Sequence, residues 1–217
     1  MNNNKAGITV DVYSDVICPW CYIGKSRLDE AIKILEDDVE VKVEWKTYQL
    51  NASMPAEGID REQYLIGKFG NANINAVQQQ VSKAASQHGL TINLNQIKRI
   101  PNTRKAHKLL RFAKRYDLQE VVLDILYRKF FYHGQDLGST EVLVSCAGLA
   151  GLPTKEVAAF LSSDESLGEI QEEEEAAFEI GVSAVPTFVV GEEIISAGAE
   201  SATELAKLLK TAAGKKR

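Results

Sequence analysis

Two cysteines separated by two residues constrain this chain more than any other feature. They lie in the tetrapeptide Cys18-Pro19-Trp20-Cys21, which follows an alternating run from Ile8 to Tyr13 and precedes a helix-like pattern. This order places one thiol at a helix N-terminus, where unpaired backbone N–H groups and the helix dipole favour the thiolate. Because the thiolate is the form of cysteine that attacks disulfides, the tetrapeptide predicts thiol-disulfide exchange.

The length and charge of the chain bound its fold and its partners. With 217 residues, 45% hydrophobic and 25% charged, the chain has enough apolar material for one large domain or for a core domain with an insertion. The net charge of -5 gives no general electrostatic reason to bind nucleic acid or an anionic membrane. No segment approaches the roughly 20 apolar residues of a membrane span. We therefore expect a partner that is a protein or small molecule carrying a thiol or a disulfide.

The N-terminal segment, residues 1–7, lacks the apolar stretch of a secretory signal. We therefore expect a cytoplasmic protein. Because the cytoplasm is reducing, the three cysteines argue against a scaffold held by disulfides and for catalytic, metal-binding or buried thiols.

Hydrophobic periodicity predicts the elements of the chain as far as residue 181. Alternation at residues 8–13 and 39–45 predicts two half-buried strands. The apolar residues between them recur at helical spacing, which completes a βαβ unit whose crossover should be right-handed. From about residue 60 to residue 181 the period is helical throughout.

The C-terminal stretch returns to strands. Thr187 to Val190 and Ile194-Ile195 flank a turn and predict a hairpin, and Ser201 with Glu204 has the form of a capping box that starts a last helix. The division is thus a βαβ half at residues 1–59, a helical insertion with a connecting helix at residues 60–181, and a ββα half at residues 182–217.

This order of elements resembles the α/β thioredoxin fold with a large all-helical insertion, as in DsbA-like proteins. Cys-x-x-Cys opens the first helix, and Val185-Pro186-Thr187 precedes the third strand. Further stretches make the chain similar to the FrnE-type branch, the cytoplasmic DsbA-family proteins labelled polyketide-biosynthesis dithiol-disulfide isomerases. These stretches are residues 14–24, 48–51, 54–58 and 181–188. The resemblance covers essentially the whole chain.

The resemblance implies roles for particular residues. Cys18 is expected to attack a partner disulfide and Cys21 to resolve the mixed disulfide, with no metal and no organic cofactor. Pro186 is expected to follow a cis peptide bond. Val185 beside it is expected to offer main-chain groups to an extended substrate.

The two residues between the cysteines shape the same site. Pro19 suits the first turn of a helix, where its missing N–H costs nothing. Trp20 is interpreted as an aromatic that shields the sulfur or touches the substrate, with plain packing as the alternative. The best-studied DsbA proteins carry a histidine between the cysteines, so their strong oxidant behaviour is not implied here.

Other interpretations concern metal binding and the remaining polar residues. A structural zinc site needs about four ligands, and only Cys146 and three scattered histidines remain beside the dithiol. Cys146 lies on an apolar stripe, which predicts a buried, inert thiol. The histidines, His107 among them, are interpreted as surface or capping residues. Two charged stretches are interpreted as solvated faces, with an interdomain or partner contact as the alternative. One is a basic helical face that includes Lys108, and the other is the acidic run from Glu172 to Glu175.

Two other functions stay open. The same inserted fold serves kappa-class glutathione transferases and 2-hydroxychromene-2-carboxylate isomerases, in which a serine typically replaces the first cysteine. This chain keeps both cysteines, which favours dithiol chemistry. Residues 101–107 and 198–201 are similar to segments of those relatives, so glutathione stays open as a ligand or redox partner. The third function is a redox-switched chaperone or binding protein.

Overall fold

The computed structural model describes residues 5–215, which form two compact units. One unit takes in the chain up to Tyr48 and from Glu173 onward, and the other is Gln49–Glu172. Residues 1–4 lie outside the described residues, and with them most of the segment on which the expectation of no export rests. None of the described helices is long and apolar enough to cross a membrane.

The boundaries of the units differ from those expected from the sequence, which were placed after residue 59 and after residue 181. Gly58 shows the reason at the first boundary. A Cβ atom on Gly58 would lie 2.5 Å from the carbonyl oxygen of Ile100, so this loop fits closely against the helical unit. At the second boundary, helix α8 (Leu167–Glu179) continues from one unit into the other.

The first unit contains a four-stranded sheet in the order β2-β1-β5-β6. Strands β1 (Ala6–Ser14) and β2 (Val39–Thr47) are parallel, as their βαβ connection requires. Strand β5 (Thr187–Val190) pairs antiparallel with β1, and β6 (Glu193–Ala197) pairs antiparallel with β5. The predicted strands and the predicted hairpin are confirmed, and the α/β thioredoxin fold with them.

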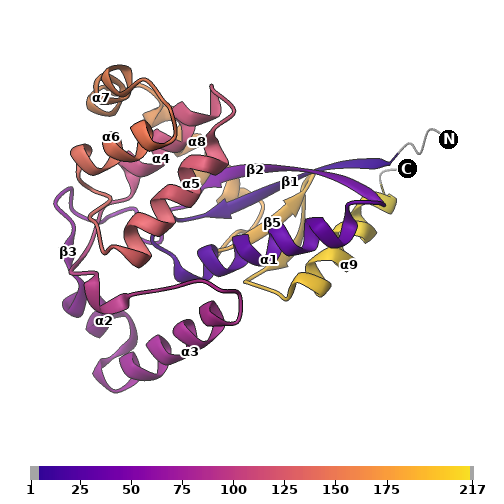
Figure 1. Ribbon diagram of the computed structural model, residues 1–217, viewed down its shortest axis with the longest axis horizontal. Coiled ribbons are helices and arrows are strands. Elements are labelled where there is room, and N and C mark those ends of the chain that lie inside the picture. The colour runs from indigo at the N-terminus through magenta and orange to yellow at the C-terminus, as the bar shows by residue number, and fades with distance from the viewer. Residues whose placement is uncertain (1–4, 216–217) are drawn as a thin grey trace. The chain divides into compact units, whose positions relative to one another are not determined.

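Helices α1 (Pro19–Leu35) and α9 (Ala202–Lys215) pack against each other in this unit (Figure 1). The buried side of α1 includes Leu28, Ala31 and Leu35, the apolar positions that predicted a helix. Helix α9 starts where the capping pattern placed it, because the backbone N–H of Glu204 donates to Ser201 Oγ at 3.2 Å.

An apolar cluster formed by β1, β5 and the end of α8 completes the core of the first unit. It contains Tyr13, Ala177, Val182 and Val189. The acidic run from Glu172 to Glu175 was expected to be solvated, but one of its residues has a partner in the protein. Glu173 Oε2 accepts a hydrogen bond of 3.0 Å from the backbone N–H of Thr47, at the end of β2.

The second unit is helical apart from one short strand pair. Strands β3 (Ile59–Asp60) and β4 (Arg99–Ile100) pair antiparallel. The longer helices are α2 (Arg61–Phe69), α3 (Ile74–Ser86), α4 (Arg104–Lys114), α5 (Gln119–Tyr127), α6 (Thr140–Leu149) and α7 (Thr154–Ser162). Three short helical turns complete the unit, η1 (Asn71–Asn73), η2 (Leu94–Gln96) and η3 (Arg128–Tyr132).

Two polar residues of α4 correct the expectations from sequence. His107, interpreted as a surface or capping residue, and Lys108, interpreted as part of a solvated face, are each only 2% exposed. Lys108 Nζ donates to the carbonyl oxygen of Phe160 at 2.8 Å and to that of Ser163, at the C-terminal end of α7. The last carbonyl groups of a helix have no partner within it, so the ammonium group satisfies them while the aliphatic stem of Lys108 is buried.

Candidate active site

The end of β1 and the start of α1 hold the two cysteines. After Ser14 the chain turns, and the backbone N–H of Cys18 donates to Asp15 O at 3.1 Å. Cys18 is the N-cap residue of α1, and its carbonyl oxygen accepts from the N–H groups of Cys21 and Tyr22 at 3.1 and 3.2 Å. Pro19 follows in the first helical turn, where its missing N–H removes no hydrogen bond of the helix. The structure thus places Cys18 at the helix N-terminus that the sequence predicts.

The two thiols are free, buried and hydrogen-bonded to each other. Cys18 is 4% exposed and Cys21 is 1% exposed. The hydrogen bond from Cys21 lowers the pKa of Cys18, against the opposing effects of burial and of the nearby Asp15 carboxylate. Burial raises the pKa of Cys21 well above its ordinary value, and the hydrogen bond with Cys18 adds to this. Cys18 is therefore the thiol that ionises first.

The loop before β5 lies against Cys18. The Val185–Pro186 peptide bond is cis, and Pro186 is buried. The thiol of Cys18 donates to the carbonyl oxygen of Val185, with 3.7 Å between sulfur and oxygen, across 167 positions of sequence. The structure therefore brings Cys18, Cys21, Val185 and Pro186 together. Pro19 and Trp20, the other two residues singled out from the sequence, are partly exposed beside them.

Gly24, one turn after Cys21, allows the proline loop to approach the helix. A Cβ atom on Gly24 would lie 2.7 Å from Pro186 Cγ and 3.7 Å from Ala199 Cβ. Three residues later, Arg27 donates a hydrogen bond to the carbonyl oxygen of Ala199. Sequence reasoning assigned no role to Gly24, although a glycine inside a helix is a signal of close packing.

Asp15 is a second residue that sequence reasoning left without a role. It is 0% exposed, and its charge acts on Cys18 to raise the pKa of that thiol. A signal was present in the sequence, because an acidic residue three positions before a redox-type cysteine pair can change the free energy of the thiolate.

The third cysteine lies in the other unit. Cys146 in α6 is fully buried, as its apolar stripe predicts, and burial raises its pKa to about 11. Such a thiol is almost entirely protonated near neutral pH, which leaves it inert. Among the described residues, no group of three or more histidine, cysteine, aspartate or glutamate side chains is placed to hold a metal ion.

Residues 9–210 match the family model for the DSBA-like thioredoxin domain. The chain belongs to this family. The DsbA-like fold extends over both halves of the sheet and the helical unit between them, since the match runs from β1 to α9.

Several known proteins are similar to this DsbA-like chain over most of its length. The uncharacterized protein YwbO of Bacillus subtilis is 29% identical over 201 residues, which are 88% of this chain and 91% of YwbO. A probable DsbA oxidoreductase from Streptomyces coelicolor has 28% identity and a TM-score of 0.86, over 96% of this chain and 91% of its own. The cytosolic disulfide reductase DsbM from Pseudomonas aeruginosa, solved with GSH, has 14% identity and a TM-score of 0.64, over 96% and 98%. The likeness to DsbM shows the fold alone.

Proposed function

We propose that this DsbA-like protein is a thiol-disulfide oxidoreductase that works through Cys18 and Cys21. The observation that carries the proposal is the unlike state of the two thiols, the pKa of Cys18 being lowered and that of Cys21 raised. The attacking thiol must ionise readily, whereas the resolving thiol must stay protonated until the mixed disulfide has formed.

The exchange takes two balanced steps. The Cys18 thiolate attacks one sulfur of a partner disulfide; the partner's S–S bond breaks, a Cys18–partner disulfide forms, and the released thiolate takes up a proton. Cys21 then loses its proton and attacks Cys18 Sγ, which releases the partner as a dithiol and leaves a Cys18–Cys21 disulfide. Two electrons pass to the partner. The reverse sequence oxidises a dithiol, and the reduction potentials of the partners set the direction.

The loop before β5 supplies the proposed docking groups. The Val185 carbonyl oxygen already accepts a hydrogen bond from Cys18 and lies where a main chain could pair beside the sulfur. The exposed parts of Trp20 and Pro19 would then contact the side chains that flank the substrate cysteine. Exchange of this kind needs no metal and no organic cofactor.

Reduction of insulin by dithiothreitol tests the proposal. The protein should accelerate precipitation of the insulin B chain, and Cys18→Ser should bring the rate down to that of dithiothreitol alone. A wild-type rate equal to the uncatalysed rate, for substrates of several sizes, would remove the oxidoreductase proposal.

Glutathione-dependent transfer or isomerisation is the second candidate. It is supported by the fold shared with DsbM, a protein solved with GSH. Conjugation of glutathione to a chromogenic electrophile separates the two candidates, because a transferase needs no second thiol and would keep its activity in Cys21→Ser. Activity in neither assay would favour a redox-switched chaperone. The cytoplasmic location stays a prediction.

A further inference from the structure

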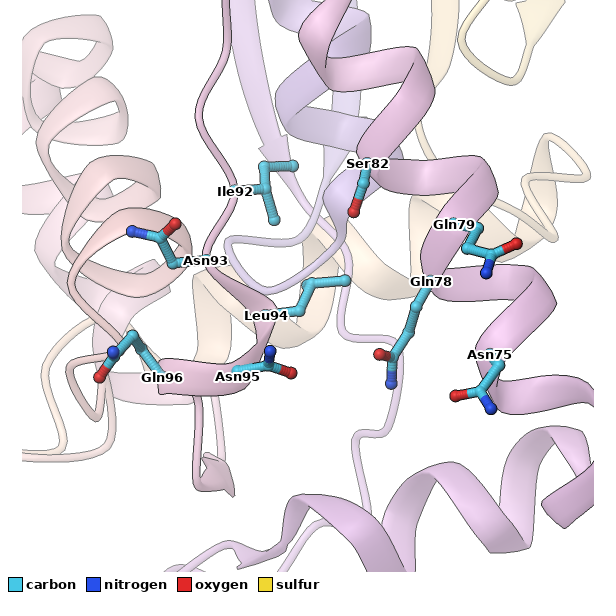
Figure 2. Close-up of a pocket in the computed structure, with 9 residues that line it drawn as sticks. All are labelled: Asn75, Gln78, Gln79, Ser82, Ile92, Asn93, Leu94, Asn95 and Gln96. Carbon is cyan, nitrogen blue, oxygen red and sulfur yellow. The ribbon is translucent and has the colours of Figure 1, made fainter.

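The helical unit contains a groove that the dithiol chemistry does not use. Helix α3 and the segment from Ile92 to Gln96, which includes the turn η2, line an open pocket of about 630 Å³ (Figure 2). A second pocket of about 530 Å³ shares three of its lining residues, Asn75, Gln78 and Asn95, so the two pockets form one continuous groove. None of the nine residues that line the first pocket is charged.

The three shared residues are carboxamides at the surface of the groove, Asn75 and Asn95 exposed and Gln78 half-buried. Their side chains make no hydrogen bond to any other described residue. Asn75 and Gln78 lie on one face of α3, three positions apart, and Figure 2 shows them across the gap from Leu94 and Asn95 of the turn. A carboxamide donates two hydrogen bonds and accepts two. This is the capacity that the alternating N–H and C=O groups of an extended peptide require.

Arg61, in the part of the groove formed by the second pocket, has a side chain without a hydrogen-bond or ion-pair partner among the described residues. It lines the second pocket at the first position of α2, where the helix dipole disfavours a cation. Its guanidinium group is partly buried and makes no hydrogen bond or ion pair with any described residue. Burial lowers the pKa of Arg61. A carboxylate bound here would form the charge-assisted, bidentate pair for which a guanidinium group is suited.

The other charged residues of the second pocket are two acids and one base. Asp60 caps α2 by accepting from the backbone N–H of Gln63 at 3.0 Å, and Glu62 is exposed. Lys98 Nζ donates to the backbone carbonyl of Asn95 at 2.8 Å. The two acids balance the charges of Arg61 and Lys98, so the pocket has no net positive charge. An incoming carboxylate would therefore be selected by the unpaired guanidinium group rather than by a general positive field.

We propose that this groove binds an extended peptide whose main-chain amides pair with Asn75, Gln78 and Asn95 and whose carboxylate pairs with Arg61. An oligosaccharide could also satisfy the carboxamides, but it would leave Arg61 unpaired. The binding needs neither Cys18 nor Cys21 and goes beyond the proposed exchange reaction.

The test is a titration followed by ¹H–¹⁵N NMR of the side-chain NH₂ groups. The probe is an acetylated, cysteine-free pentapeptide of alanine and glutamine, with a free C-terminal carboxylate or a C-terminal amide. Signals of Asn75, Gln78 and Asn95 should shift on saturation. Gln78→Ala should weaken binding about five- to tenfold, since one or two hydrogen bonds are lost.

Gln80→Ala is the matched control, because Gln80 is an exposed carboxamide of the same helix that lines neither pocket. It should change the dissociation constant less than twofold. Asn95→Ala repeats the test on η2, so that a folding defect in one variant does not decide the result. Equal effects of Gln78→Ala and Gln80→Ala in folded proteins would overturn the proposal.

A cycle with Arg61→Gln tests the carboxylate. Arg61→Gln and amidation of the peptide should each weaken binding about tenfold, and both together no more than one alone, because they remove the same ion pair. Additive effects would overturn the assignment of Arg61. Absence of binding at millimolar peptide, or equal binding of maltohexaose to the same signals, would overturn the peptide as ligand.

Discussion

Cys18 and Cys21 carry the same chemical group, yet their surroundings give them opposite tendencies to ionise. Cys18 is at the start of a helix, with a thiol donor beside it, whereas Cys21 is inside the first turn and nearly without solvent. A buried thiolate is costly unless hydrogen bonds stabilise it. Cys18 receives such a hydrogen bond and is the reactive thiol, whereas burial keeps Cys21, three positions later, protonated.

The first prediction concerns the roles of the cysteines. Cys18→Ser should abolish disulfide exchange, whereas Cys21→Ser should accumulate covalent adducts, because the second thiol is needed only to release the partner. Non-reducing electrophoresis with mass spectrometry detects the adducts. Cys146→Ser serves as the control and should leave turnover unchanged, since that thiol is buried in the other unit. Equal adduct formation in the Cys18 and Cys21 variants would contradict the assignment.

The second prediction concerns pH. The rate at which iodoacetamide alkylates Cys18 should rise with pH around a midpoint below that of free cysteine, and Cys21→Ala should move the midpoint upward by removing the hydrogen bond. A depressed pKa stabilises the reduced fold above the unfolded pKa, and this stabilisation is lost as pH falls through the folded pKa. A midpoint unmoved by Cys21→Ala would show that the Cys21 thiol is not the cause.

The third prediction concerns Gly24. In Gly24→Ala the new Cβ atom would meet the ring of Pro186 at 2.7 Å, so the ring must shift and carry the Val185 carbonyl away from Cys18. We expect exchange with a peptide disulfide to slow by about tenfold or more, while the protein remains folded. Gly214→Ala in α9, where nothing lies within 4 Å, is the matched control and should keep full turnover. Equal rates for the two variants would refute a positioning role.

At the level of elements, short local signals fix where the helices begin. Helix α1 begins directly after an extended N-cap residue followed by proline, and α9 begins with Ser201 accepting from the N–H of Glu204. Both helices then pack together, so the starting point of each decides which side chains reach the sheet.

The fourth prediction concerns the cap of α9. Ser201→Ala should lower the free energy of unfolding by about 1 kcal/mol, because an N–H group of the first turn loses its acceptor. Ser201→Asp should keep most of the stability, since aspartate accepts in the same way and complements the helix dipole. Urea denaturation followed by circular dichroism measures both. Equal urea midpoints for the wild type and Ser201→Ala would show that the cap does not contribute to stability.

For the whole molecule, net charge acts on encounter rather than on the exchange step itself. With a net charge of -5, the protein should react a few-fold faster with cystamine, a cationic disulfide, than with the neutral 2-hydroxyethyl disulfide at low salt. The ratio of the cystamine rate to the 2-hydroxyethyl disulfide rate should fall near 0.15 M salt, where charges are screened beyond about 8 Å. It should approach the ratio measured when free cysteine attacks the same two disulfides. Stopped-flow kinetics at two ionic strengths measures it, and a salt-independent ratio would contradict the prediction.

The elements that depend on local pattern could be predicted from the sequence. Alternation gave β1 and β2, the turn-flanked β-branched runs gave the hairpin, and the spacing of Cys18 and Cys21 placed a thiol at the start of α1. These follow from the periods of strands and helices and from the chemistry of helix ends, which need only neighbouring residues.

Contacts between residues far apart in the sequence could be found only in the folded structure. The contact between Cys18 and Val185 spans 167 positions, the space beside Gly24 is filled by Pro186, and Lys108 is buried by the end of another helix. A basic residue in a polar stretch carries no local sign of burial, so Lys108 was expected at the surface. Burial and close approach depend on the packing of complete elements, which no short window of sequence contains.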